Sequence, residues 1–375
     1  MEFIGIDLHT NKFTCCYRDE HSSLDGKGGK LTETFELNPC GLMAFSQTLG
    51  PETYVLIEAT ISTFTFARLI QPLVKEVIVA NTYELKQISL ARKNTDKIDA
   101  DILCRVLKMQ VLSGEQAISP VTIPPVEIQE LRSLFSTYRL LKKESTQTKN
   151  RIHSLLKEKL YGFTQEQIFS QKSREMVRKI EVDQGPKGSM MHRQINLLLD
   201  LLEKLEAEIE SLKEMVLEQA EPFMREIKIL TSMKGVSVFI AIAIIADIIK
   251  VDRFKNSKAF TSYLRSAPRV SNSNTSVSIR GINKKGRKLS SSLLTQSMHH
   301  VLDSSPKLDK WYRRLAKYKK AGLVRTGLRR RIFAEMFQML KKGEYHYGRE
   351  VEKHEAKMRQ YRNFLKKRKI LVKTA

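Results

Sequence analysis

Four carboxylic acids in the first hundred residues have the types and spacing of a site for divalent cations. Asp7 ends the apolar stretch FIGID, and Glu58 ends a second one, YVLIE. Asp96 and Asp99, in NTDKIDAD, would share one face of a helix, whereas Asp101 would point elsewhere. Two hard cations such as Mg²⁺, held ~3.5–4 Å apart by carboxylates, can drive phosphodiester cleavage. The set predicts a nuclease site that binds two Mg²⁺ ions, with Mn²⁺ as an alternative ion.

Each acid also has an ordinary structural explanation. Asp7 could be a surface residue where a strand meets a turn. Asp96 could be an N-cap or first-turn acid of a helix, and Asp99 could interact favourably with the helix dipole. Zinc is not indicated, because no Cys/His cluster is present. Four cysteines without a CxxC pair also predict no disulfide framework. The ordered set of acids on two strands and a helix nevertheless favours a nuclease.

These acids need an α/β scaffold, and roughly the first 110 residues have the pattern of one. Strands are expected at 2–7, 12–18, 31–37, 54–58 and 76–80, with helices at 41–49, 63–74, 83–91 and 96–109. The turn-forming stretch HSSLDGKGG precedes the third strand and predicts an antiparallel meander. If the strands that end in Asp7 and Glu58 pair side by side, both carboxylates lie at one edge of the sheet.

Long helices follow the proline-containing stretch SPVTIPP. One is expected over about 127–160, and a second carries an a/d seam formed by Ile195, Leu198, Leu202, Leu205, Ile209, Leu212 and Val216. They predict either an antiparallel helical hairpin or a dimerising coiled coil. A third unit begins near Met224, where MKGVSVFIAIAIIADI resembles half of a helix–hairpin–helix, whose turn amides can hold a phosphate. A polar loop over Ala267–Gly286 and helices from about Leu289 complete the chain.

The expected fold class is therefore α/β plus all-α. An α/β nuclease domain is expected at 1–118, and the linker and long coiled-coil-like helices at 119–223. A mainly helical C-terminal domain is expected at 224–345, followed by a basic tail at 346–375.

Positive charge gathers in the last quarter of the chain. Of the net charge of +24, Arg280–Ala375 supplies +21, with 28 Lys and Arg against 7 Asp and Glu. This is an electrostatic footprint for nucleic acid, and interleaved tyrosines could stack on bases: Tyr312, Tyr318, Tyr345, Tyr347 and Tyr361. The longest apolar run, Val236–Ile249, is too short to cross a bilayer, and the N-terminus lacks a secretion signal. We expect a soluble cytoplasmic protein that binds nucleic acid and not membranes.

The combination of motifs resembles a family of bacterial enzymes, the DEDD-type transposases of the insertion-sequence one-hundred-and-ten family and their related invertases. The similar stretches cover most of the chain and are GIDLH, IEAT, KNTDKIDA, NRIHSLLKEKLYGF, MKGVSVFIAIAIIADI and DRFKNSKAFTSYLRSAPR. The resemblance implies an RNase H-like (RuvC-like) domain in which Asp7, Glu58, Asp96 and Asp99 are the catalytic metal ligands. It also implies a C-terminal domain with a serine nucleophile.

Ser273 is the residue that matches the nucleophile in the family pattern. It stands five residues after Pro268, and an Ile-x-Lys-x-Gly segment at 282–286 follows at the matching interval. Ser276 is the runner-up, and the segment alone would suggest only a polar, flexible loop. Neighbouring cations are either clamps for nucleic-acid phosphates or simply solvated charges: Arg280, Lys284, Lys285, Arg287 and Lys288.

The resemblance also implies the partners: donor and target DNA, a structured noncoding guide RNA, and a homodimer or homotetramer. The predicted function is a DNA transposase that cuts and rejoins strands through the metal site and Ser273. Two other functions stay open. A junction-resolving endonuclease would hydrolyse DNA at the metal site without a covalent intermediate, and a structural nucleic-acid-binding protein would not need the acids.

Overall fold

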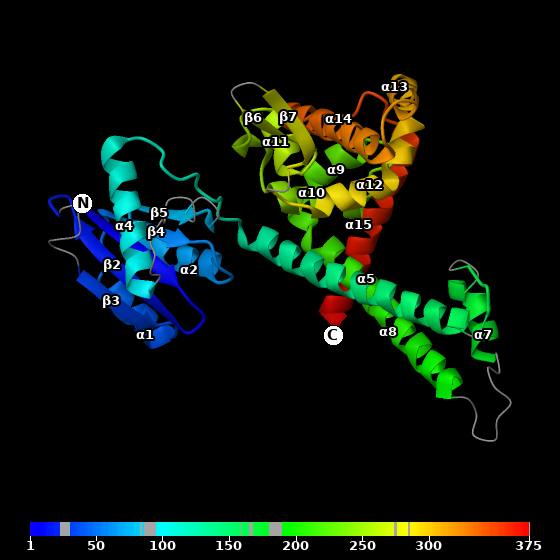
Figure 1. Cartoon of the computed structure of the whole chain (residues 1–375), viewed down its shortest axis with the longest axis horizontal. Coiled ribbons are helices and arrows are strands. Elements are labelled where there is room, and N and C mark those ends of the chain that lie inside the picture. The colour runs from blue at the N-terminus through cyan, green and yellow to red at the C-terminus, as the bar shows by residue number, and fades with distance from the viewer. Residues whose placement is uncertain are drawn as a thin grey trace. The chain divides into compact units, whose positions relative to one another are not determined.

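The chain forms two compact units, Met1–Pro124 and Pro125–Ala375, in the computed structural model. The structure describes residues 1–22, 31–82, 85, 95–158, 160–164, 168–179, 190–273, 276–283 and 286–374. Unit 1 is a mixed α/β fold, and unit 2 is mainly helical (Figure 1). The boundary falls between the two prolines that end the SPVTIPP stretch, where neither strand nor helix continues easily.

Unit 1 is built on a five-stranded sheet in the order β3-β2-β1-β4-β5. The strands are β1 (Glu2–Leu8), β2 (Lys12–Asp19), β3 (Leu31–Glu36), β4 (Thr53–Glu58) and β5 (Glu76–Ala80). The first three form the expected antiparallel meander, and β4 and β5 run parallel to β1. The predicted ranges of all five strands are confirmed to within one residue. The predicted helix at 83–91 lies, apart from residue 85, outside the described residues.

Helices cover both faces of this sheet (Figure 1). They are α1 (Pro39–Ser46), α2 (Thr63–Ile70) with the short 3-10 helix η1 (Gln71–Leu73), and α4 (Asp96–Ser113). Phe45 of α1 and Phe66 of α2 share a core with Ile6 of β1, whereas Leu103 of α4 shares a second core with Phe3. Alternate side chains of β1 therefore serve opposite faces, as strand geometry requires.

Helix α4 rests directly on the backbone of β1. Gly5 lies on the α4 face, and a Cβ atom there would stand 2.2 Å from the backbone nitrogen of Cys104 and 2.3 Å from the carbonyl oxygen of Ala100. Only glycine permits so close an approach. By the same alternation Asp7, two residues on, also faces α4.

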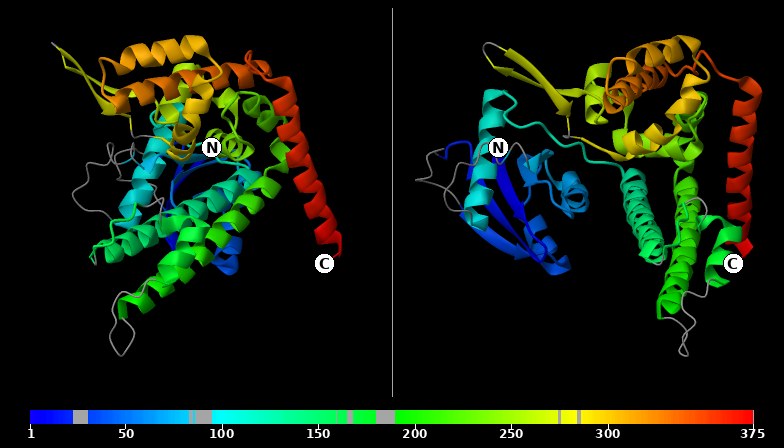
Figure 2. Two further views of the ribbon diagram at one scale, coloured as in Figure 1. Left: turned by 90° about the vertical axis from the view of Figure 1, so that its right-hand side faces the viewer. Right: turned by 45° about the vertical axis from the view of Figure 1, so that its right-hand side comes forward.

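Unit 2 begins with two long helices, α5 (Val126–Glu158) and α8 (Met190–Gln219), which lie side by side (Figures 1 and 2). They are antiparallel, because Ile128 near the start of α5 shares a core with Val216 near the end of α8. Ile152 and Ile195 meet likewise in a core at the other end. Of the two arrangements that the seam predicts, the chain forms the helical hairpin within itself. Helix α7 (Gln171–Lys179) lies between them in the sequence.

The core of unit 2 surrounds an apolar helix, α10 (Val238–Ile248), which is buried throughout from Ile240 to Ile248. The turn from α9 (Met224–Thr231) to α10 contains Gly235 at φ +84°. That turn packs on α12 (Leu289–Leu302), since a Cβ atom on Gly235 would come within 3.0 Å of the His300 side chain. The predicted glycine turn followed by an apolar helix is therefore present, with the glycine against a neighbouring helix.

An antiparallel hairpin of β6 (Pro268–Ser273) and β7 (Ser276–Ile282) projects from the helices of unit 2 (Figure 2). It follows η3 (Val251–Arg253) and α11 (Ser257–Tyr263). The prediction of an irregular loop here is wrong. Serines and asparagines conceal the strand signal, which rests on the β-branched residues Val270, Val277 and Ile279.

Helices α12, α13 (Pro306–Ala316), α14 (Ala321–Lys342) and α15 (Val351–Thr374) confirm the helical C-terminus. Part of its charge is neutralised within the unit, because Arg368 of α15 forms ion pairs with Glu214 and Glu218 of α8. Tyr361 is buried and donates a hydrogen bond to the Leu217 carbonyl oxygen at 2.7 Å. The prediction that Tyr361 stacks on bases is therefore wrong.

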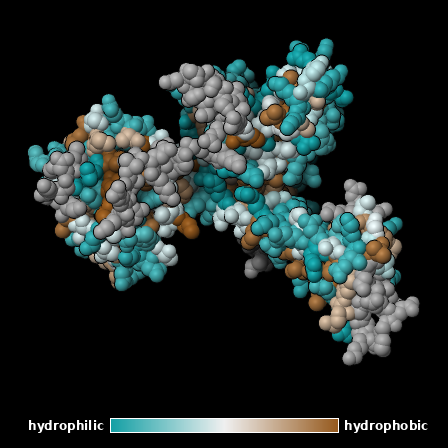
Figure 3. All heavy atoms as spheres, viewed as in Figure 1, coloured by the Kyte–Doolittle hydropathy of each residue, from teal (hydrophilic) through white to brown (hydrophobic). Residues whose placement is uncertain are grey.

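Other basic and aromatic residues of this region stay at the surface. Tyr318 is 80% exposed and Tyr347 is 77% exposed, so both are accessible for stacking. The visible face over α13 and α14 is mostly hydrophilic (Figure 3). Among the helices that the structure describes, none combines the length and apolar character needed to span a membrane.

Candidate metal site and serine hairpin

Asp7 is a buried carboxylate near the C-terminal end of β1. Its side chain is 8% exposed and faces the first turns of α4. Burial raises the pKa of Asp7, and the nearby carboxylates of Asp99 and Asp96 raise it further, while His9 acts in the opposite direction. A cation at this position would offset both the lost hydration and the repulsion between carboxylates.

The first turn of α4 supplies two more acids. Thr95 caps the helix, its hydroxyl oxygen accepting a hydrogen bond from the Ile98 nitrogen at 3.4 Å, and Asp96 and Asp99 follow. Burial raises the pKa of Asp99, with a further contribution from Asp96. In contrast, a hydrogen bond from Lys12 lowers the pKa of Asp96. Asp96 is thus held in its charged form beside two acids whose charged form a cation would stabilise.

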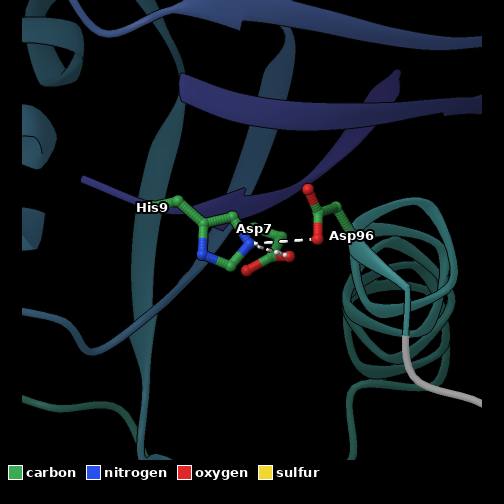
Figure 4. Close-up of side chains that lie close together, drawn as sticks. All are labelled: Asp7, His9 and Asp96. Atoms are coloured by element: carbon green, nitrogen blue, oxygen red, sulfur yellow. Dashed lines mark hydrogen bonds and ion pairs between the residues drawn. The ribbon is translucent and has the colours of Figure 1, made fainter. Parts of the chain in front are cut away.

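His9 lies between Asp7 and Asp96 (Figure 4). Its Nε2 atom is 3.0 Å from Oδ2 of Asp7 and 3.3 Å from Oδ1 of Asp96. The other carboxylate oxygen of Asp96 is 2.7 Å from Nζ of Lys12, at the start of β2. Over the described ranges, Asp7, His9 and Asp96 form the one group whose ligand atoms all lie within 4.8 Å of one another, close enough to share a metal ion.

Glu58 lies at the end of β4, the strand parallel to β1. Ile6 of β1 pairs with Ile57 of β4, and Asp7 and Glu58 are the next residues on these two strands. The two acids therefore stand at the ends of neighbouring strands. Strand alternation places Glu58 on the α4 face as well. Neither Glu58 nor Asp99 belongs to the compact group of ligand atoms around His9.

Asp101 is separate from this site, as its position on the helix predicts. It is buried on the other side of α4, where Nη2 of Arg18 from β2 approaches its Oδ1 atom at 2.7 Å. This ion pair ties α4 to the sheet and so helps to fix the first turn of the helix. Its role is structural, whereas His9 and Lys12, the residues that contact Asp7 and Asp96, line a hollow in the surface.

That hollow has a volume of about 640 Å³ and is lined by residues 9–12 and 34–36. It gives a phosphate group room to approach His9 and Lys12. Neither residue was among the site residues predicted from the sequence. The signal was the tight turn between the first two strands, which brings residues 9 and 12 together, as the hydrogen bond from the His9 nitrogen to the Lys12 carbonyl oxygen at 3.0 Å shows.

Both candidate nucleophiles of unit 2 lie at the tip of the β6–β7 hairpin. Ser273 ends β6, Ser276 begins β7, and the two are cross-strand partners. Lys284 and Lys285 lie outside the described residues, and for Arg280 the structure describes only the backbone, in β7. Lys288 is exposed just before α12, in a position open to solvent.

The base of the hairpin is fixed to the core through Asp247, a fully buried acid of α10. Its Oδ1 atom accepts a hydrogen bond from Nε of Arg287 at 2.7 Å. Its Oδ2 atom accepts bonds from the backbone nitrogen and the hydroxyl of Ser290, at 3.0 and 2.7 Å. Arg132 of α5 donates to the carbonyl oxygens of Ala246 and Asp247, and burial lowers the pKa of Arg132 to about 10. Arg287 thus anchors the chain that leaves the hairpin.

Two further arginines hold the chain that enters it. Arg265 donates from Nε to the carbonyl oxygen of Gly286 at 2.5 Å and so links the entering and leaving segments. Arg329 donates to the hydroxyl of Ser266 at 2.9 Å and to the Arg265 carbonyl oxygen at 3.1 Å, and burial lowers its pKa. Gly286 adopts φ +147°, and a Cβ atom there would stand 2.2 Å from the Tyr263 carbonyl oxygen. Hydrogen bonds thus link both the entering and the leaving chain at the base of the hairpin to their neighbours.

Two family models match separate stretches of this chain. Residues 4–160 match a model for DEDD-type transposases of IS110, described as Transposase, and residues 227–313 match the Transposase IS116/IS110/IS902 family. No curated protein matches the chain significantly. The first stretch contains all four predicted acids, and the second contains the hairpin with Ser273 and Ser276. The chain therefore belongs to the IS110 family of DEDD transposases, enzymes that recombine DNA.

Proposed function

We propose that this transposase cuts and rejoins DNA strands with a Mg²⁺-binding DEDD site and a serine nucleophile. Residues 1–118 would form an RNase H-like (RuvC-like) nuclease domain, which the sheet order β3-β2-β1-β4-β5 supports. Residues 119–223 would supply the long helices, 224–345 the domain that carries the serine, and 346–375 the basic tail. The observation that carries the proposal is the meeting of Asp7 and Asp96 around His9.

Asp7, Glu58, Asp96 and Asp99 are the proposed metal ligands, with two Mg²⁺ ions as the expected complement. Carboxylate oxygens suit such ions, and the raised pKa values of Asp7 and Asp99 indicate a site that favours added positive charge. Bound there, the ion would polarise the phosphate and favour deprotonation of a hydroxyl. Lys12 would keep Asp96 charged and oriented, and it would present a cation to the DNA backbone beside the hollow.

Ser273 is the proposed nucleophile, with Ser276 as the alternative. The serine Oγ would attack the phosphorus as its proton leaves. A phosphoserine bond would then replace one phosphodiester bond, and a free hydroxyl would remain on the other DNA end. Attack by a different DNA hydroxyl on the phosphoserine would rejoin the strands and release the serine. Because one ester replaces another, rejoining needs no external source of energy.

We also propose that a noncoding guide RNA and a dimer or tetramer of this chain take part. The C-terminal concentration of positive charge supports a large nucleic-acid surface. Binding through phosphates should weaken steeply as salt rises, because each neutralised phosphate releases counterions. A flat salt response of DNA and RNA affinity would contradict this part of the proposal.

Covalent trapping tests the chemistry directly. The full chain would be incubated with Mg²⁺, the junction DNA of the element and its flanking RNA, and a denaturing gel would be examined for a protein–DNA adduct. We expect an adduct in the wild type that is lost in Ser273→Ala and in Glu58→Gln. Glu52→Gln is the matched control, because Glu52 is an exposed acid of unit 1 paired with Lys75.

The outcomes separate the alternatives. An adduct that survives Ser273→Ala but is lost in Ser276→Ala would move the nucleophile across the hairpin. A hydrolytic junction-resolving enzyme would give a different result. The wild type would cleave DNA without forming an adduct, both serine variants would still cleave, and Glu58→Gln would abolish cleavage. DNA binding with no cleavage in any variant, together with no Mg²⁺ binding, would contradict the nuclease proposal.

A further inference from the structure

We propose that His9 is itself a ligand of the metal ion and makes the site prefer a transition metal such as Mn²⁺ over Mg²⁺. This inference rests on the proposed metal site and names its selectivity. The four-acid set is an all-oxygen site, whereas the structure places an imidazole nitrogen between two of its acids. Imidazole nitrogen suits first-row transition metals, whereas Mg²⁺ is bound mainly by oxygen.

The distances match those of ligands around a single ion. Donors at ~2.1 Å from one ion stand ~3 Å apart when they occupy neighbouring positions in its coordination shell. Nε2 of His9 is 3.0 Å from the nearer oxygen of Asp7 and 3.3 Å from that of Asp96. One atom from each of the three side chains can therefore face a common centre (Figure 4).

Local structure holds the three groups in this arrangement. His9 lies in the turn between β1 and β2, where Leu8 pairs with Phe13 and the His9 nitrogen donates to the Lys12 carbonyl oxygen. Nζ of Lys12 forms an ion pair with Oδ2 of Asp96, so that Oδ1 of Asp96 is directed at His9. Such outer contacts orient metal ligands and strengthen binding. The imidazole is also 47% exposed, so it can turn towards an ion without rearrangement of the core.

A different role for the same contacts is a protonated His9 that neutralises Asp7 and Asp96. In that role the nitrogen carries a proton and cannot bind a metal. The two roles predict different spectra, because only a coordinated nitrogen receives unpaired spin density from Mn²⁺ through a bond and so has a contact coupling, whereas a nearby uncoordinated nitrogen has only a weak coupling through space. The selectivity between metals separates them as well, since a counter-ion would compete equally against Mn²⁺ and Mg²⁺.

The experiment uses the full chain loaded with Mn²⁺ alone. Electron spin-echo envelope modulation would be recorded on the wild type and on His9→Gln, and on wild type containing ¹⁵N-labelled histidine. We expect a nitrogen coupling in the wild type that changes with ¹⁵N and is lost in His9→Gln. Calorimetric titration should show at least about a tenfold loss of Mn²⁺ affinity in His9→Gln, the lower end of the cost of losing even an outer partner. The loss of Mg²⁺ affinity should be smaller.

His21→Gln is the matched control, because His21 is the other histidine of unit 1 and is exposed. It should keep both the coupling and the affinity. Mn²⁺ binding that depends on Asp7, shown with Asp7→Asn, but lacks a nitrogen coupling would overturn the role of His9 and leave the proposed metal site standing. Absence of any Asp7-dependent binding would overturn both. Equal losses for Mn²⁺ and Mg²⁺ in His9→Gln would overturn the selectivity.

Discussion

The two units arrange like charges in opposite ways. In unit 1, burial raises the pKa values of Asp7 and Asp99, the neighbouring carboxylates raise them further, and His9 offsets these effects only in part. In unit 2, the half-buried Arg132 and Arg329 have lowered pKa values, yet both donate hydrogen bonds to backbone carbonyl oxygens. Charge left partly uncompensated marks a place for a ligand. Charge that is fully engaged, as at the hairpin base, marks a support.

Both units depend on a glycine at the critical contact. Gly5 allows α4 to rest on β1, and Gly286 allows the chain leaving the hairpin to pass close to Tyr263. The first contact brings acids together on opposite elements. The second fixes a hairpin whose tip carries the candidate serines. A close backbone contact at a glycine therefore positions the candidate metal ligands in unit 1 and supports the hairpin in unit 2.

Removal of Asp247 should have the largest effect on stability. Asp247→Ala leaves Arg287 without its buried partner and the backbone nitrogen of Ser290 without an acceptor. We expect about 3–5 kcal/mol less unfolding free energy for unit 2, measured by urea denaturation. Asp252→Ala is the control, because its ion pair with Lys341 is exposed and should contribute about 0–1 kcal/mol. Similar losses in both variants would contradict the supporting role of Asp247.

Gly5→Ala should have the next largest effect. The added methyl group would meet the backbone of α4, which must move away from β1, at a cost of about 1–3 kcal/mol in unfolding free energy. Metal affinity should fall as well, because Asp96 and Asp99 move with the helix. Gly50→Ala has room, with only the Thr53 hydroxyl 3.7 Å away, and should leave both quantities nearly unchanged. Normal metal affinity in Gly5→Ala would show that the close contact does not position the site.

Divalent-cation affinity should fall as pH decreases. Binding requires charged carboxylates, and the raised pKa values of Asp7 and Asp99 mean that these acids take up protons at a higher pH than an ordinary aspartate. The affinity should be maximal and constant above the raised pKa values. Below them it should drop by up to about tenfold per pH unit for each proton displaced. Titration calorimetry across pH 4–8 would measure this, and a flat profile down to pH 4 would contradict it.

Lys12→Met should have the smallest effect of the four changes. The substitution keeps most of the unbranched side chain, one atom shorter, and removes the hydrogen bond that lowers the pKa of Asp96. Because Lys12 is exposed, we expect metal affinity at neutral pH to change by no more than about fivefold. The loss of metal affinity should grow as the solution is acidified, because Asp96 takes up a proton at a higher pH in the variant than in the wild type. A uniform loss at all pH values would indicate that Lys12 acts only on the fold.

Much of unit 1 was predictable because its signals are local. Apolar runs between turn-forming residues define the strands, and Asp7 and Glu58 follow from their positions at strand ends. His9 and Lys12 were not found in this way, because their contacts with Asp96 depend on how α4 packs on β1 and β2, which are far from it in the sequence. Periodicity predicts that α4 has a face, but not which residue of β1 it touches.

The hairpin of unit 2 was missed for a different reason. Its strands are short and rich in serine and asparagine, so alternation of polar and apolar residues is weak. The hydrogen bonds at the base of the hairpin join residues that are far apart in the sequence, such as Asp247 with Arg287 and Arg265 with Arg329. The buried position of Tyr361 was likewise hidden, because the basic residues around it suggested a solvated helix.

The contact of Gly5 with Ala100 and Cys104 also sets the order in which the acidic site forms during synthesis. It closes a loop that spans most of unit 1, and contacts of such long range are made late in folding. A nascent chain that has not yet passed α4 contains Asp7 and Glu58 but lacks Asp96 and Asp99. The proposed metal site therefore stays incomplete on the ribosome until α4 has emerged.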